Sequence, residues 1–205
     1  MDLPWNAACC EVCALPLTET AICGACQGKL PPYHRAIASF SYVDPVAHLI
    51  HGLKYGQRLD YGRFLGEQLA NTLQSAHDLI MPDCLLPVPL HRKRLMERGF
   101  NQAYEIAKPV AKRFGLTVLK SGMVERSRHT AEQSQLNAKE RRRNLKNAFS
   151  TNTNVSGLSI AIIDDVMTTG ATVSELSRVL IREGARRVEV WVVSRAADRN
   201  LMSKP

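Results

Sequence analysis

An acid pair that precedes a short run of small and hydroxyl-bearing residues is the part of this chain best suited to chemistry. The apolar run 160–163 leads directly into Asp164 and Asp165, and the loop 168–172 follows closely. After the loop, apolar residues recur at helical spacing. A buried strand, two carboxylates, a loop and a helix thus follow in order. In open α/β sheets, ligands bind beyond the carboxyl ends of strands, where this order positions the loop.

The loop has the composition of a phosphate site, with the residues Thr168, Thr169, Gly170, Ala171 and Thr172. Backbone N–H groups and hydroxyls at a helix N-terminus bind anions, and a glycine permits close approach of the backbone. Asp164 and Asp165 would repel that phosphate, so they need hydroxyls or a hard cation, such as a ribose diol with Mg²⁺. The motif predicts a ligand of the ribose 5-phosphate type. The alternative interpretation is a capping cluster after an ordinary strand.

A second group of reactive side chains lies near the N-terminus, in two C-x-x-C knuckles made by Cys10 with Cys13 and Cys23 with Cys26. Four thiolates at this spacing are typical of a closed, tetrahedral structural Zn²⁺ site, whereas a lone C-x-x-C would also suit redox chemistry. Cys9 is interpreted as a spare thiol. With all four positions filled, catalysis by this metal is not expected.

Positive charge is concentrated in one part of the chain. Between residues 91 and 146, fifteen Lys and Arg oppose five Glu, a balance of +10, so the remainder carries −2 of the total +8. Such a block favours a polyanionic partner, either nucleic acid or a phosphate-rich small molecule, although a solvated surface is the alternative. The candidate contacts for pyrophosphate or nucleic acid are Arg92, Arg94, Arg98, Arg126 and Arg128.

The elements that must position these groups alternate between strand and helix patterns. We expect strands at 36–42, 84–90, 116–120, 159–163 and 188–193, and helices at 46–53, around 65–73, 103–114 and 173–180. This alternation predicts an α/β fold with a parallel sheet. The polar, basic stretch 125–146 is long for an idle connection, so a mobile functional segment is expected there.

The segment 160–172 resembles the motif that binds 5-phosphoribosyl-1-pyrophosphate (PRPP) in type I phosphoribosyltransferases. The resemblance implies that Asp164 and Asp165 contact the ribose hydroxyls and that the loop 168–172 holds the 5-phosphate, with Mg²⁺ accompanying PRPP. Other segments, among them Leu53-Lys54-Tyr55 and Arg98-Gly99-Phe100-Asn101-Gln102, resemble the ComF/GntX family across nearly the whole chain. The family resemblance implies a zinc ribbon at 1–32 and a Rossmann-like phosphoribosyltransferase-type domain at 33–205.

Three functional hypotheses follow. The first is an enzyme that transfers phosphoribosyl to an unknown acceptor, with Asp164, Asp165 and Arg128 as catalytic candidates. The second is a protein that handles single-stranded DNA, because the family resemblance implies natural transformation or use of external DNA, with DNA-uptake or recombination proteins as partners. The third is a regulator that binds PRPP or a nucleotide without turnover. No run of about 18 apolar residues and no secretory signal is visible, so a cytoplasmic location without a membrane span is expected.

Overall fold

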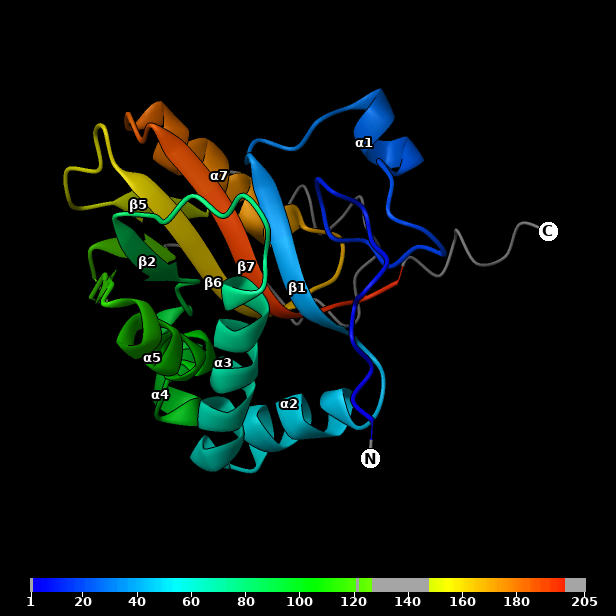
Figure 1. The fold of residues 1–205 in the computed structure, drawn as a ribbon. Helices are drawn as coiled ribbons and strands as arrows, with labels where there is room; N and C mark the ends of the chain where they lie inside the picture. Colours follow the sequence, from blue (N-terminus) through cyan, green and yellow to red (C-terminus); the bar gives the residue numbers. More distant parts are fainter. Residues whose placement is uncertain (1, 121, 127–147, 198–205) are drawn as a thin grey trace.

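A five-stranded parallel sheet forms the centre of the protein (Figure 1). The computed structural model describes residues 2–120, 122–126 and 148–197. The strand order is β1-β7-β6-β2-β3, with every neighbouring pair parallel. The strands are β1 (Arg35–Ser41), β2 (Cys84–Pro87), β3 (Thr117–Val118), β6 (Ser159–Met167) and β7 (Arg187–Arg195). The predicted parallel α/β fold is confirmed.

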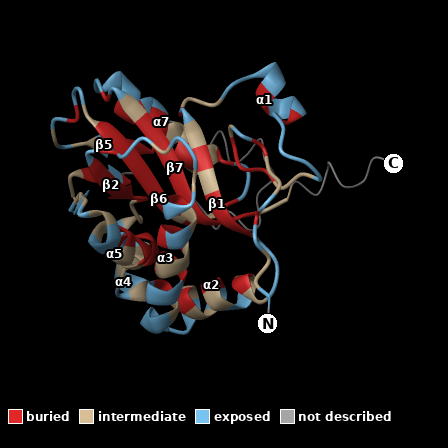
Figure 2. Cartoon of the chain, in the orientation of Figure 1, coloured by how far each residue is buried: buried red, intermediate tan, exposed pale blue. Residues whose placement is uncertain are grey.

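Apolar residues fill both faces of the central strands, because successive side chains of a strand point to opposite faces. In β6, Ile160 and Ile162 pack into one core, whereas Ala161 and Ile163 pack into the other. Trp191 of β7 is fully buried on the second face. The buried sheet therefore lies between two outer layers (Figure 2).

Helices α2 (Val46–Tyr55), α3 (Leu59–Gln74) and α5 (Gln102–Phe114) share a core with Trp191 and cover that face. Helix α7 (Ala171–Arg182) covers the other face together with the N-terminal cysteine segment, which contains the short helix α1 (Gly24–Gly28). Two small strands, β4 (Val124–Arg126) and β5 (Phe149–Thr151), pair antiparallel and contribute Val124 and Phe149 to the core beneath α7.

Helix α5 has clear local start and stop signals. The Asn101 side chain accepts a hydrogen bond from the backbone N–H of Ala103 at 2.9 Å, which caps the first turn. Gly115, in the left-handed conformation, ends the helix, as the sequence predicts. These caps fix where Gln102, in the first turn, enters the core.

Two local predictions differ from the structure. No helix is predicted between residues 90 and 103, but the basic segment after β2 forms a short helix, α4 (Arg92–Arg98), capped by the His91 side chain. Strand β6 also continues through Met167, so both aspartates lie within the strand instead of following it. The reason is that β7 pairs with β6 up to Met167 and holds this stretch extended.

The N-terminal segment runs along the outer edge of β1. The backbone of β1 exchanges hydrogen bonds with Pro4, Asn6 and Val12 over 2.8–2.9 Å, and the ring of Trp5 contacts Phe40. The predicted boundary between residues 32 and 33 stays a prediction. Within the described residues, no helix has the length and apolar character that crossing a bilayer requires.

Candidate functional site

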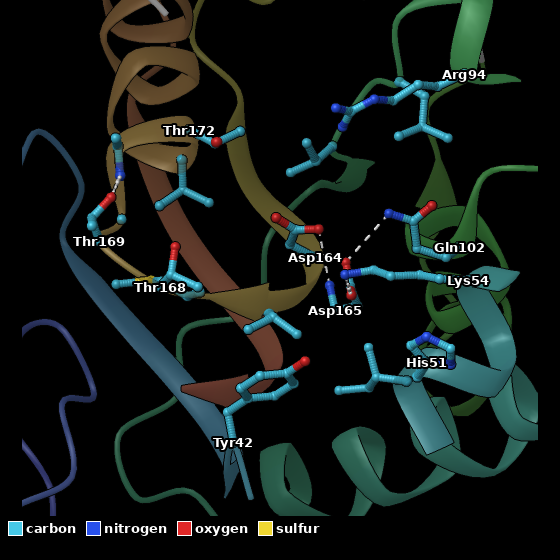
Figure 3. Close-up of a pocket in the computed structure, with 18 of the residues that line it drawn as sticks. Tyr42, His51, Lys54, Arg94, Gln102, Asp164, Asp165, Thr168, Thr169 and Thr172 are labelled. Atoms are coloured by element: carbon cyan, nitrogen blue, oxygen red, sulfur yellow. Dashed lines mark hydrogen bonds and ion pairs between the residues drawn. The ribbon is translucent and has the colours of Figure 1, made fainter. Parts of the chain in front are cut away.

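A cavity of about 430 Å³ opens where β6 meets α7, and its walls come from distant parts of the chain. Both aspartates and the whole loop 168–172 line it. Side chains of α2, α4 and α5 close the opposite wall, as Figure 3 shows. The structure thus brings the predicted acid pair and the predicted phosphate loop into one space.

The two aspartates have different surroundings. Asp165 is buried, and its carboxylate forms an ion pair with Lys54 and accepts a hydrogen bond from Gln102 Nε2 at 3.3 Å. Asp164 is less buried, and its Oδ1 accepts a hydrogen bond from the backbone N–H of Asp165 at 2.9 Å. Asp165 is therefore fixed by the protein, whereas Asp164 faces the cavity (Figure 3).

This arrangement separates the pKa values of the pair. Burial and then the neighbouring Asp165 charge raise the pKa of Asp164 well above its usual value of 3.8. Burial alone would also raise the pKa of Asp165, but attraction and hydrogen bonding by Lys54 lower it below the usual value. Asp165 is thus the carboxylate that keeps its charge most readily.

The loop 168–172 leads into the N-terminus of helix α7. Gly170 has φ +71° and is the N-cap of α7, a conformation that side chains adopt only with strain. The Thr169 hydroxyl accepts a hydrogen bond from the backbone N–H of Ala171 at 3.4 Å. Thr168 and Thr169 are exposed at the cavity. The N-terminus of α7, which is the positive end of the helix dipole, therefore lies at the cavity beside the threonine hydroxyls.

The predicted arginine contacts separate into different positions. Arg94 and Arg126 line the cavity, whereas Arg92 lines a second cavity of about 660 Å³. Arg98 instead donates a 2.6 Å hydrogen bond to Gln102 Oε1, so it contacts the residue that holds Asp165. Arg128 and most of the predicted mobile segment lie outside the described residues.

Arg126 is an unusual cation because it is buried, with 8% of its surface exposed. Burial and then the nearby Arg94 lower the pKa of Arg126 to about 10, while Asp164 opposes this change. Its side chain therefore remains charged at neutral pH. The charges of Arg94, Arg126 and Asp164 thus interact electrostatically within the cavity.

Sequence reasoning did not assign site roles to Lys54, Gln102, Tyr42 or His51, all of which line the cavity. Lys54 and Gln102 do fall within the two segments that carry the family resemblance. No local pattern distinguishes Tyr42 or His51. The ring of His51 lies beside that of Tyr55, with the two ring centroids 4.7 Å apart.

The four predicted zinc ligands are brought together. The Sγ atoms of Cys10, Cys13, Cys23 and Cys26 all lie within 4.8 Å of one another, and the four residues are buried. A tetrahedron with Zn–S bonds of about 2.3 Å has sulfur atoms about 3.8 Å apart, close to the 3.7 Å between Cys13 and Cys23. The cluster therefore fits a metal ion such as zinc. Cys9 does not belong to it.

The parallel sheet, the acid pair and the loop at the α7 N-terminus define a protein of the phosphoribosyltransferase class. The phosphoribosyl transferase domain family matches residues 101–204. Among solved structures, a glutamine PRPP amidotransferase from B. subtilis overlaps 69% of this chain and 30% of its own, at 19% identity and a TM-score of 0.46.

Curated relatives narrow the assignment. DNA utilization protein YhgH of Escherichia coli K12 is 39% identical over 190 residues, which cover 91% of this chain and 83% of that protein. Competence protein F of Haemophilus influenzae is 33% identical over 85% of this chain and 78% of its own length. Competence protein ComFC of Bacillus subtilis is 25% identical over 85% and 72%. The chain belongs to the ComF/GntX family.

Asp164→Asn should stabilise the ligand-free protein at neutral pH. A carboxyl group whose pKa is raised by folding favours the fold below its usual pKa and loses this contribution as pH rises through the raised value. Removing the charge should therefore add about 1 kcal/mol at pH 7.5, or a few degrees in unfolding midpoint. The gain should shrink toward pH 4.5. Thermal unfolding measures this, with the exposed Asp60→Asn as control; a lower midpoint at pH 7.5 would contradict the assigned shift.

Cys26→Ser should lose tightly bound zinc. Mutating a residue that hydrogen-bonds to a metal ligand typically lowers the metal affinity about 10- to 100-fold. Removing one thiolate ligand itself should therefore lower the zinc affinity more than about 100-fold. Cys9→Ser should retain one zinc ion per chain, because Cys9 lies outside the cluster. Metal analysis after dialysis against a chelator distinguishes the two variants. Equal zinc content in both would refute the four-cysteine assignment.

Proposed function

We propose that the cavity binds PRPP together with Mg²⁺. One observation carries this proposal, namely that an acid pair and the N-terminus of helix α7 line the same cavity. The 5-phosphate would lie on the loop 168–172, and the ribose hydroxyls would contact Asp164 and Asp165, with Asp164 nearer the ligand. A carboxylate that faces the cavity also suits Mg²⁺, which proteins commonly hold with one or two carboxylates and substrate phosphates. When bound, Mg²⁺ would neutralise charge on the pyrophosphate.

Phosphoribosyl transfer to an acceptor is the reaction that this geometry supports best. The bond between ribose C1 and the pyrophosphate oxygen would break, and the acceptor would bond to C1 and release a proton. Arg94 and Arg126 would stabilise the departing pyrophosphate, so positioning and electrostatics would supply the catalysis. Arg128 remains a further candidate for this role.

The acceptor would approach C1 from the side opposite the leaving group. Arg94 and Tyr42 lie on opposite sides of the acid pair in Figure 3. The wall formed by Tyr42, Ile50 and His51 would therefore receive the acceptor. This wall combines ring surfaces with two groups that can exchange protons. A regulator that binds PRPP without turnover would use the same cavity, and release of pyrophosphate distinguishes the two.

The curated relatives are named for DNA utilisation and competence, and we infer a cytoplasmic role of that kind for this chain. A second candidate function, binding of single-stranded DNA, is favoured by the second cavity. Arg92 and Lys120 line that cavity together with the rings of Phe100 and Tyr104. Cations that follow a phosphate backbone beside rings on which bases stack are typical of single-strand sites. DNA-uptake or recombination proteins would be partners in this role.

Calorimetric titration of PRPP with Mg²⁺ into zinc-loaded protein tests the first proposal. Asp164→Asn should weaken binding on the order of 100-fold, because hydrogen bonds to a charged group are worth about 1.5–3 kcal/mol each, and adding Asp165→Asn should abolish binding. Asp60→Asn should leave the affinity unchanged. Because Asp164→Asn is expected to be more stable than wild type, its loss of binding cannot be assigned to unfolding. Unchanged affinity in the double variant would refute the ribose assignment.

Single-stranded DNA binding should weaken steeply as salt rises. Each lost phosphate contact should reduce the slope of log affinity against log salt by about 0.7, so Arg92→Ala and Lys120→Ala should each flatten it. Tyr104→Ala should lower affinity without changing the slope, because stacking releases no counterions. Fluorescence anisotropy with oligo(dT) measures these effects, with Arg178→Ala on α7 as control. An absent or salt-independent signal would exclude this role.

A further inference from the structure

Arg195, the last residue of β7, connects the cysteine cluster to the phosphate loop. Its side chain is buried, with 6% of the residue exposed. Nε donates a hydrogen bond to the backbone oxygen of Cys13 at 3.1 Å. Nη1 donates to the backbone oxygen of Met167 at 3.0 Å, and also to that of Thr168. One guanidinium therefore contacts a predicted zinc ligand and the start of the loop.

The contact with Cys13 depends on the conformation of its knuckle. The backbone N–H of Ala14 bonds to the oxygen of Cys10 at 2.8 Å and closes the turn between the first two thiols. A metal held by both sulfur atoms would fix this turn, and with it the direction of the Cys13 oxygen. Metal binding would thus determine whether the acceptor for Arg195 Nε is in place.

Charge favours the same connection. Among the described residues, no carboxylate forms an ion pair with Arg195. A zinc ion with four thiolates carries a net charge of about −2. That cluster would supply the missing counter-charge for a buried cation, which otherwise has a large desolvation cost.

Tyr33 lies in the same buried core as the four cysteines. It is buried, and its hydroxyl lies 3.8 Å from the point where a side chain on Gly170 would begin. Burial and then the Cys13 thiolate raise the pKa of Tyr33, whereas Arg195 lowers it. Tyr33 therefore lies close to the loop and within the electrostatic reach of both Cys13 and Arg195.

We propose that Arg195 is a positioning residue that couples metal binding at the cysteine cluster to the phosphate loop. This inference rests on the proposed binding of PRPP. With metal bound, Arg195 holds the oxygens of Met167 and Thr168 and sets the direction in which the loop N–H groups point. A lysine at position 195 would keep the positive charge, but it lacks the planar guanidinium whose N–H groups donate to Cys13 on one side and to Met167 on the other.

Coupling between two binding sites is reciprocal. If bound zinc raises the affinity of the protein for PRPP, then bound PRPP must raise the affinity for zinc by the same factor. The zinc affinity is therefore a readout that does not depend on turnover, and it can be measured on the intact wild-type protein. A merely structural role for Arg195 would change stability without changing this mutual dependence.

The experiment measures the equilibrium affinity of the protein for zinc by competition with a coloured chelator, with and without saturating PRPP and Mg²⁺. We expect PRPP to raise the zinc affinity of wild type at least about fivefold, within the usual range of coupling. The effect should persist in Arg187→Lys and fall below about twofold in Arg195→Lys. Arg187 is a matched control because it lies at the opposite end of β7 and pairs with Glu189. An equal rise in zinc affinity in Arg195→Lys, or no rise in wild type that binds PRPP, would overturn the proposal.

A second measurement separates this inference from the proposed function. If titration shows that PRPP does not bind, amide hydrogen exchange over residues 166–176 is compared between zinc-loaded and zinc-stripped protein. Stripping should speed exchange in this segment of wild type and Arg187→Lys. In Arg195→Lys, exchange should already be fast with zinc bound and change little on stripping. Exchange that is insensitive to zinc in wild type would refute the coupling, whatever ligand the cavity takes.

Discussion

Two adjacent carboxylates at the end of a buried strand are the constraint on which the surrounding structure depends. Their repulsion is relieved because Lys54 pairs with Asp165 and Gln102 donates to it. Arg98 in turn donates to Gln102. Helices α2 and α5 therefore contact Asp165 directly, and α4 supports it through Gln102. This leaves Asp164 as the carboxylate that faces the cavity. A buried ion pair of this kind contributes more to the shape of a site than to stability.

The local parts of this site could be predicted from sequence, and the distant parts could not. Strand β6, the aspartates, the loop and the cysteine knuckles each lie within a few residues, so their order alone indicates their chemistry. Lys54 and Gln102 stand 111 and 63 positions before Asp165, and only the crossing of α2 and α5 over the sheet brings them to it. No periodic pattern contains that information.

Helix α4 could not be predicted from sequence for a different reason. Its seven residues include four cations and no buried side chain, so the hydrophobic periodicity from which helices are recognised is absent. The helix is defined instead by the His91 cap and by Gly99, in the left-handed conformation, at its C-terminus. The consequence for the site is that Arg94 and Arg98 lie on a helix where the sequence predicts none.

The N-terminal segment covers the outer edge of β1. An open edge of a parallel sheet carries unpaired backbone groups that invite strand addition from another chain. Here Pro4, Asn6 and Val12 occupy those groups, so the segment that carries the cysteine cluster also shields one margin of the sheet. If the N-terminal segment detached from β1, the unpaired edge of that strand would be exposed. Two such chains could then pair edge to edge and self-associate.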